Sequence, residues 1–326
     1  MRSERKKKKI IVVVGPTASG KSALAVTLAR KFCGEVISAD SRQVYKGLNV
    51  GTGKITKKEM RRVPHHLLDV AYPKKQFTAA DYEKLARAKI SEIFARGRLP
   101  IICGGTGHYI DAALGRVQIP DVPPNPALRK KLEKKSAPEL FALLKTLNKH
   151  RAETIDSHNP RRLVRAIEIA LADADKSVLS ASGGPPHSIR IEWPRPHPSF
   201  SERLAFVRSL NVVWLGITLP PAELKKKISM RLFARIRRYK MIEEARRLHK
   251  RGLSWKRMES LGLEYRYLSR YLRGYMTKVE MIEKLQTEIY LYAKRQMTWF
   301  KRNKEIQWFL PSQKKQIFDM LEHEGL

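Results

Sequence analysis

Residues 15–22, Gly-Pro-Thr-Ala-Ser-Gly-Lys-Ser, have the residue types and the spacing of a phosphate-binding loop. They fit the pattern G-x-x-x-x-G-K-[ST] between an apolar run and a helical pattern. Glycines let backbone N–H groups turn toward phosphate oxygens, and the N-terminus of the following helix adds positive potential. We therefore predict that a diphosphate or triphosphate binds here with Mg²⁺ as cofactor, Ser22 being the metal ligand. The predicted phosphate-binding residues are Gly15, Pro16, Thr17, Ala18, Ser19, Gly20, Lys21 and Ser22.

Asp40 is the acidic residue nearest to this loop in the predicted topology. It follows a predicted strand at 35–39, and ligands of open α/β sheets bind at the carboxyl ends of the strands. Two roles fit its carboxylate: a cap for the strand end, or a proton acceptor for a nucleophile that attacks the phosphate-bearing substrate. The predicted strand at 99–103 is followed by Gly-Gly-Thr, so it ends without the carboxylate that usually organises water in an NTPase. We therefore expect a reaction other than hydrolysis.

Strand and helix patterns alternate around these residues. The continuous run at 10–14, Ile-Ile-Val-Val-Val, is typical of a strand that is buried on both faces of a parallel sheet. Further strands are predicted at 35–39, 99–103 and 212–218, with a helix at 79–95. This alternation predicts an α/β fold, a P-loop NTPase-like parallel sheet with flanking helices.

The middle of the chain has a different pattern. Pro-rich connectors enclose two helical patterns at 127–147 and 160–175. We therefore predict a helical insertion domain at 121–198 within a catalytic core made of 1–120 and 199–326. From Ala222 onward the pattern is helical and basic, with 17 Lys and Arg against four acidic residues in 225–275.

The charge of the whole chain favours a polyanionic partner. There are 66 Lys and Arg against 31 Asp and Glu, which gives a formal net charge of +35. Nucleic acid is the expected partner, although a generally basic proteome or an adaptation for solubility would produce the same balance. Two distant cysteines, Cys33 and Cys103, predict a reducing compartment. No apolar run is long enough to span a membrane, so we expect a cytoplasmic protein.

Six motifs follow one another over nearly the whole chain. They lie at 15–22, 38–54, 64–69 (Pro-His-His-Leu-Leu-Asp), 104–110 (Gly-Gly-Thr-Gly-His-Tyr-Ile), 159–168 and 293–302 (Ala-Lys-Arg-Gln-Met-Thr-Trp-Phe-Lys-Arg). In this order they resemble the tRNA dimethylallyltransferase family. With only two cysteines, the chain has no counterpart of the zinc finger of the longer eukaryotic members, so it resembles the bacterial type. Members of this family transfer a prenyl group from dimethylallyl diphosphate to N6 of the adenine just 3′ of the anticodon.

The resemblance implies roles for single residues. Asp40 would take the proton from the N6 amine, Thr106 would bind near the reacting centre, and Arg231 would help to neutralise the diphosphate. For any single cation among the implied tRNA contacts, a solvated surface position remains the alternative. His108 departs from the family, which usually has an aliphatic residue there. The implied tRNA contacts are Asp40, Ser41, Arg42, Gln43, Thr106, Arg129, Arg161, Arg162, Leu163, Val164, Arg165, Gly262 and Arg266.

Two other functions remain open from the sequence. One is prenylation of free adenine nucleotides, which would need neither the net charge of +35 nor the helical insertion. The other is an ATP-dependent kinase or NTPase, which the strand end without a carboxylate disfavours. We expect the protein to act as a monomer.

Overall fold

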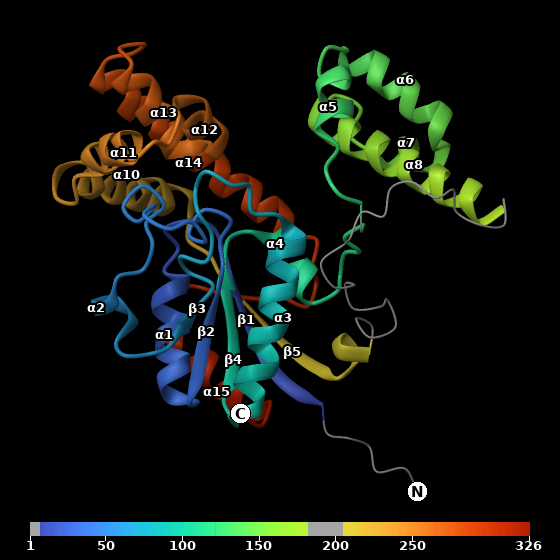
Figure 1. Cartoon of the computed structure of the whole chain (residues 1–326). Coiled ribbons are helices and arrows are strands. Elements are labelled where there is room, and N and C mark those ends of the chain that lie inside the picture. The colour runs from blue at the N-terminus through green and yellow to red at the C-terminus, as the bar shows by residue number, and fades with distance from the viewer. Residues whose placement is uncertain (1–6, 121, 182–204) are drawn as a thin grey trace, which may run out of the picture. The chain divides into compact units, whose positions relative to one another are not determined.

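A six-stranded parallel sheet forms the centre of the larger part of the chain (Figure 1). The computed structural model describes residues 7–120, 122–181 and 205–326. The strand order is β3-β2-β4-β1-β5-β6, and neighbouring strands pair in parallel throughout. The strands are β1 (Lys8–Val14), β2 (Gly34–Ala39), β3 (His65–His66), β4 (Leu99–Gly104), β5 (Leu210–Ile217) and β6 (Gln307–Phe309).

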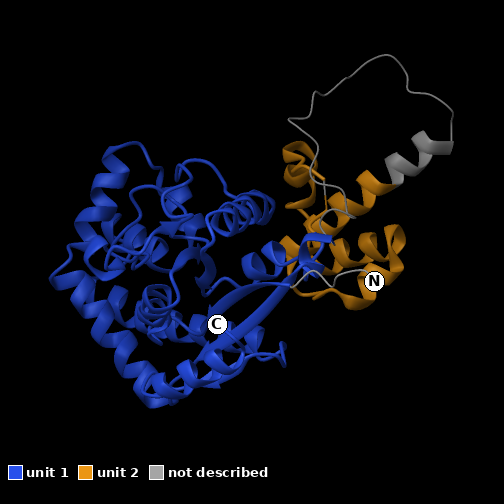
Figure 2. Cartoon of the chain, turned by 90° about the horizontal axis from the view of Figure 1, so that it is seen from below, with its two compact units in different colours: residues 1–118, 200–326 blue, residues 119–199 orange. Residues whose placement is uncertain are grey.

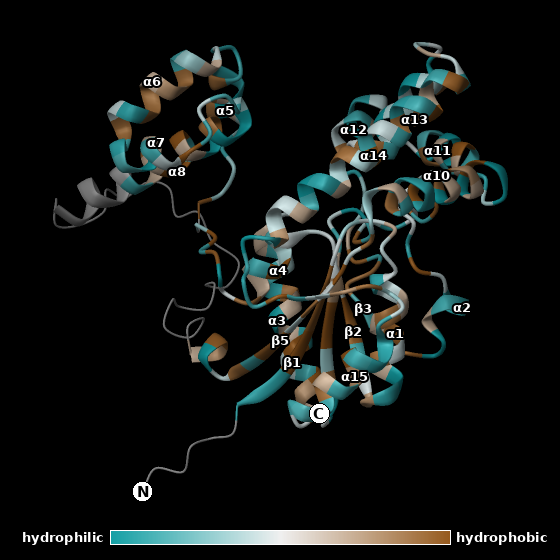
Figure 3. Ribbon diagram, turned by 180° about the vertical axis from the view of Figure 1, so that it is seen from behind, coloured by the Kyte–Doolittle hydropathy of each residue, from teal (hydrophilic) through white to brown (hydrophobic). Residues whose placement is uncertain are grey.

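Alternate residues of β1 enter two different cores, which explains why the sequence there is apolar without interruption. Ile10, Val12 and Val14 pack into the core that also contains helices α3 (Ala79–Ala95) and α4 (Gly107–Ala113). Ile11 and Val13 pack against α1 (Lys21–Lys31) and α15 (Lys314–His323) on the other face. The predicted parallel sheet with flanking helices is therefore confirmed, and Figure 3 shows that hydrophobic residues dominate the middle of the sheet.

Helices cover the carboxyl ends of the strands. They include α10 (Pro221–Arg237), α11 (Met241–Lys250), α12 (Trp255–Leu261), α13 (Leu263–Leu272) and α14 (Lys278–Phe300). Their apolar faces belong to the same core as α3 and α4. Packing into this core therefore places the basic C-terminal region, predicted as helical, beside the loops that follow the strands. A short helix, α2 (Lys57–Met60), lies in the connection between β2 and β3.

The chain divides into two compact units, residues 1–118 with 200–326, and residues 119–199 (Figure 2). In the second unit, helices α5 (Pro126–Leu132), α6 (Ala137–Leu147), α7 (Lys149–Thr154) and α8 (Pro160–Ala181) enclose a small core of their own. The Pro-rich connector predicted at 183–198 lies outside the described residues. Among the described residues, none of the helices has the length and the apolar sequence that would be needed to cross a membrane.

Candidate active site

The loop at 15–22 has the form that its sequence predicts. It joins the end of β1 to the first turn of α1, and both glycines have positive φ, 147° at Gly15 and 96° at Gly20. A Cβ atom on Gly15 would lie 2.2 Å from the carbonyl oxygen of Ile217, so only glycine fits this position. The backbone N–H groups of the first turn of α1 have no partner within the helix and are available for an anion.

Lys21 lies across the loop and faces the cavity. Its Nζ donates to the carbonyl oxygen of Pro16 at 3.1 Å, and burial lowers its pKa. The neighbouring Arg231 lowers this pKa further, whereas Cys103 and Asp40 act in the opposite direction. Two cations crowded together without an anion between them are destabilised, and a bound diphosphate would relieve that repulsion.

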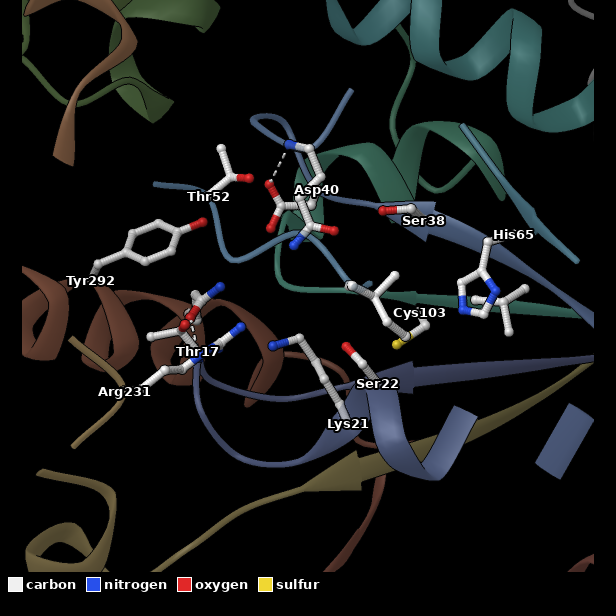
Figure 4. A pocket seen from close by; sticks show the side chains of 15 residues that line it. Thr17, Lys21, Ser22, Ser38, Asp40, Thr52, His65, Cys103, Arg231 and Tyr292 are labelled. Carbon is white, nitrogen blue, oxygen red and sulfur yellow. Dashed lines mark hydrogen bonds between the residues drawn. The ribbon is translucent and has the colours of Figure 1, made fainter. Parts of the chain in front are cut away.

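Asp40 caps the end of its strand with one carboxylate oxygen, and its other oxygen is free to accept a proton. It follows the last residue of β2, and its Oδ1 accepts hydrogen bonds from the backbone N–H groups of Arg42 at 2.8 Å and Gln43 at 3.2 Å. Oδ1 is therefore the cap of the strand end. In the described part of the chain no donor is found for Oδ2, so the second oxygen is available to a substrate. Among the described residues that line the cavity, Asp40 is the one carboxylate, and Figure 4 shows it opposite Lys21 and Ser22.

Thr106 is attached to the loop that carries Asp40. Its backbone N–H donates to the carbonyl oxygen of Ala39 at 3.0 Å, and its Oγ1 accepts from the N–H of Ser41 at 3.0 Å. Tyr292 of α14 lines the cavity, and burial raises the pKa of Tyr292 to about 12. The two predicted catalytic residues Asp40 and Thr106 are thus held as one unit, from neighbouring strands.

Arg231 reaches the cavity from α10, 191 positions after Asp40 in the sequence. Its Nη2 donates to the carbonyl oxygen of Gly53 at 3.0 Å. Burial lowers the pKa of Arg231 to about 10, and the nearby Arg235 adds to this effect. Arg231 remains a cation at neutral pH, and the protein atoms around it make its interaction with an anion stronger than it would be in water.

Buried Glu244 fixes the loop that Arg231 contacts. Its carboxylate accepts the backbone N–H groups of Asn49, Val50 and Gly51 at 3.1, 2.8 and 2.9 Å and the hydroxyl of Tyr265 at 2.7 Å. The three loop residues lie in the motif at 38–54, which includes Thr52 of the cavity wall. The motif at 38–54 contributes to the resemblance found in the sequence, but its hydrogen bonds to Glu244 on α11 were not predicted from the sequence.

The predicted Mg²⁺ ligand is compatible with its surroundings. The Ser22 side chain is exposed at the cavity, which Thr17, Ser38 and Asp40 also line with oxygen atoms. The described residues contain no group of three or more His, Cys, Asp and Glu that could hold a metal ion. Mg²⁺ commonly takes few protein ligands and completes its shell with water and substrate phosphates, so this oxygen-rich cavity fits it.

Other residues of the cavity were not predicted as functional. His65 donates from Nδ1 to the carbonyl oxygen of Val63 at 2.9 Å, and burial lowers the pKa of its imidazole. Burial raises the pKa of Cys103 to about 11, so this thiol is protonated at neutral pH. Gln296 and Tyr292 come from α14, and the motif at 293–302 was the available signal for Gln296.

Two groups of predicted tRNA contacts come together beside the site. The nearest atoms to a Cβ built on Gly262 would be the Nη2 atoms of Arg266 and Arg42, both at 3.9 Å. Gly262 has φ 75° and ψ −174°, a conformation that is essentially restricted to glycine, and it joins α12 to α13. Positions 42 and 262–266, distant in sequence, thus form one basic rim in the first unit.

The predicted contacts in the second unit divide into three kinds. The side chains of Leu163 and Val164 are buried in the core of the unit, so a tRNA contact at these positions can involve only the backbone. Arg129 and Arg165 bind the buried carboxylate of Glu168, with N–O distances of 2.7 and 2.6 Å. Their side chains are therefore structural as well as basic. Arg161 and Arg162 are exposed.

Known proteins share this chain's sequence over most of its length. A family model described as IPP transferase matches residues 43–303. A relative named tRNA dimethylallyltransferase 2, from Trichlorobacter lovleyi, is 40% identical over 293 residues, which cover 90% of this chain and 88% of the relative. The chain belongs to the IPP transferase family. A second IPP transferase relative, a tRNA dimethylallyltransferase from Anoxybacillus flavithermus, is 38% identical, and the match covers 92% of this chain and 90% of the relative.

A solved structure supports the same family assignment. The full-length tRNA isopentenylpyrophosphate transferase from Bacillus halodurans matches with a TM-score of 0.67 and 32% identity. The match covers 97% of this chain and 96% of that one. The α/β fold of this IPP transferase is therefore that of a solved relative, including its flanking helices.

Proposed function

We propose that this IPP transferase transfers the dimethylallyl group from dimethylallyl diphosphate to N6 of the adenine 3′-adjacent to the anticodon in tRNA, releasing diphosphate. The observation that carries the proposal is the pairing of a phosphate-binding loop with the carboxylate of Asp40 across one cavity. The tRNA dimethylallyltransferase relatives support the choice of substrates.

The residues divide into a leaving-group side and a nucleophile side. The loop at 15–22, Lys21 and Arg231 would hold the diphosphate and neutralise the charge that develops as it leaves. Mg²⁺, held by Ser22 and the substrate's phosphates, would add a further positive charge to that side. On the opposite wall, Asp40 Oδ2 would accept a proton from N6.

The proposed reaction is a displacement at carbon. N6 of the adenine forms a bond to C1 of the dimethylallyl group as the bond between C1 and the bridging oxygen breaks. The electron pair of that bond leaves with the diphosphate, and the N6 proton goes to Asp40. Because no water attacks, the site needs no second carboxylate to activate water, in agreement with Asp40 being the one carboxylate among the described lining residues.

The nucleic-acid side of the proposal rests on charge and on the basic rim. A target adenine in a loop must be unstacked before its N6 can reach a carboxylate inside a cavity. We propose that Arg42 and Arg266 contact the backbone of the anticodon stem-loop, with Arg161 and Arg162 of the second unit as further phosphate contacts. We also propose that the protein acts as a monomer in the cytoplasm.

One assay separates this proposal from its alternatives. The protein is incubated with dimethylallyl diphosphate labelled in the prenyl group together with tRNA or AMP, and with ATP alone. We expect label in tRNA. Label in AMP alone would assign the protein to adenine-nucleotide prenylation, and release of phosphate from ATP without label transfer would assign it to the kinases or NTPases.

A further inference from the structure

Gln296 connects two walls of the cavity that are far apart in sequence. It lies on α14 and is only 6% exposed. Its Oε1 accepts the backbone N–H of Thr17 at 2.8 Å, and its Nε2 donates to the carbonyl oxygen of Gly105 at 2.9 Å. One amide group thus joins the phosphate-binding loop to the segment after β4.

The glycines of that segment are explained by the approach of α14. A Cβ atom on Gly105 would lie 2.0 Å from Gln296 Nε2, and one on Gly107 would lie 2.1 Å from the indole of Trp299. Trp299 also donates from Nε1 to Asp111 Oδ2 at 3.0 Å, which attaches the same turn of α14 to α4. Both glycines therefore allow α14 to pack closely against this segment.

The two connected walls have different tasks in the proposed reaction. Thr17 belongs to the loop that would hold the leaving diphosphate. Gly105 precedes Thr106, which is bonded to the backbone on both sides of Asp40. Gln296 therefore spans from the leaving-group side to the proton-acceptor side.

The bond to Gln296 also occupies one amide of the phosphate-binding loop. The N–H of Thr17 is committed to Gln296, and the N–H of Ser19 donates to the carbonyl oxygen of Pro16 at 3.3 Å. The amides at the start of α1, from Lys21 and Ser22, are left to point along the helix axis toward an anion.

We propose that Gln296 is a positioning residue that sets the separation between the leaving diphosphate and the Asp40–Thr106 wall. This inference rests on the proposed function. In-line displacement at carbon requires N6, C1 and the bridging oxygen to be aligned, and a misplacement of about 1 Å can cost about 10²-fold in rate. Both amide atoms of Gln296 are bonded to backbone groups, so we place its effect in the two backbone segments that it joins.

The first test removes both hydrogen bonds with little change in volume. In Gln296→Leu, kcat for prenyl transfer to tRNA should fall roughly 10–100-fold, while KM for dimethylallyl diphosphate changes less than about threefold. Gln286→Leu is the matched control, because Gln286 also lies on α14 and bonds Ser229 of α10 at 3.1 Å, away from the cavity. An unchanged kcat, or an equal loss in both variants, would overturn the inference.

The second test uses a variant whose hydrogen bonding depends on pH. In Gln296→Glu, a protonated carboxyl group can still accept from Thr17 and donate to Gly105, whereas the ionised group places negative charge against the Gly105 carbonyl. Burial, the Gly105 carbonyl and the negative charge of Asp40 favour the neutral form of the new carboxyl group. The positive charges of Lys21 and Arg231, in the same cavity, favour its ionised form. The activity of this variant relative to the unmodified protein should therefore rise as pH falls from about 8.5 to about 6.

The outcomes distinguish the inference from the proposed function. If the unmodified protein fails to prenylate tRNA, the proposed function is wrong. If it prenylates tRNA and the relative activity of Gln296→Glu falls as pH falls across this range, Gln296 does not act through its bond to Gly105. Gln296→Leu, measured at a fixed pH with its thermal unfolding midpoint, separates a loss of positioning from a loss of folded protein.

Discussion

At the residue scale, the site depends on one carboxylate whose two oxygens have different tasks. Asp40 Oδ1 caps the end of β2 through the amides of Arg42 and Gln43. Oδ2 is the oxygen available for the proton of the attacking amine. A substitution that keeps the cap and removes only the base can therefore separate structure from chemistry.

Asp40→Asn is that substitution. The amide oxygen of Asn can still accept both backbone N–H groups, but the side chain no longer accepts a proton at neutral pH. We expect turnover to fall by roughly 10²–10⁴-fold, the usual contribution of a general base. The dissociation constant for inorganic diphosphate should stay nearly the same. Turnover close to that of the unmodified protein would remove Asp40 from the reaction.

At the element scale, a single buried acid on α11 fixes the loop at 49–51. Glu244 accepts three successive backbone N–H groups, so Glu244→Ala leaves all three without this partner, with the Gly51 bond buried and the other two partly buried. We expect the free energy of unfolding to fall by roughly 2–5 kcal/mol. Urea unfolding measures it, with exposed Glu243→Ala of the same helix as control. Equal stabilities of the two variants would contradict the anchoring role.

Glu168 has a comparable position in the second unit. Burial alone would raise its pKa, but hydrogen bonds from Arg129, the Asn125 N–H and Arg165 outweigh it and lower the pKa to about 2. Because the pKa is lower in the folded state, the ionised carboxylate stabilises the folded state at pH values above the pKa of the unfolded state. This stabilisation is lost as pH falls from about 4.5 to about 2. We expect α8 to lose helicity in this pH range, and circular dichroism measures that loss. Glu168→Gln should remove that part of the pH dependence, and an unchanged profile would contradict the assignment.

Features formed by neighbouring residues can be predicted from the sequence, whereas contacts between residues far apart in the chain cannot. The phosphate-binding loop and Asp40 were predicted because each needs only its own strand and the following turn. Gln296 and Glu244 were not predicted, because their hydrogen-bond partners lie 279 and about 195 positions away in the sequence. A glycine-rich segment such as 104–107 looks like a ligand loop in the sequence, and only the packed helix shows that a glutamine and a tryptophan require the glycines.

At the scale of the whole molecule, charge governs the encounter with tRNA. A net charge of +35 implies binding that weakens steeply with salt. The double substitution Arg161→Ala with Arg162→Ala should weaken tRNA binding and reduce the slope of log K against log salt by about 0.7–0.9 for each phosphate that is no longer neutralised. The exposed pair Lys314→Ala with Lys315→Ala on α15 is the charge-matched control. Identical slopes in both double variants would exclude a specific interaction at 161–162.

The proposed reaction requires that carbon, and not phosphorus, is attacked in this cavity. Dimethylallyl diphosphate carrying ¹⁸O in the bridge between C1 and the α-phosphorus distinguishes the two, in a reaction with tRNA. We expect the ¹⁸O to be recovered in released diphosphate while the dimethylallyl group appears on tRNA. Recovery of the ¹⁸O in dimethylallyl alcohol, with an unmodified tRNA, would show attack at phosphorus and contradict the proposed reaction.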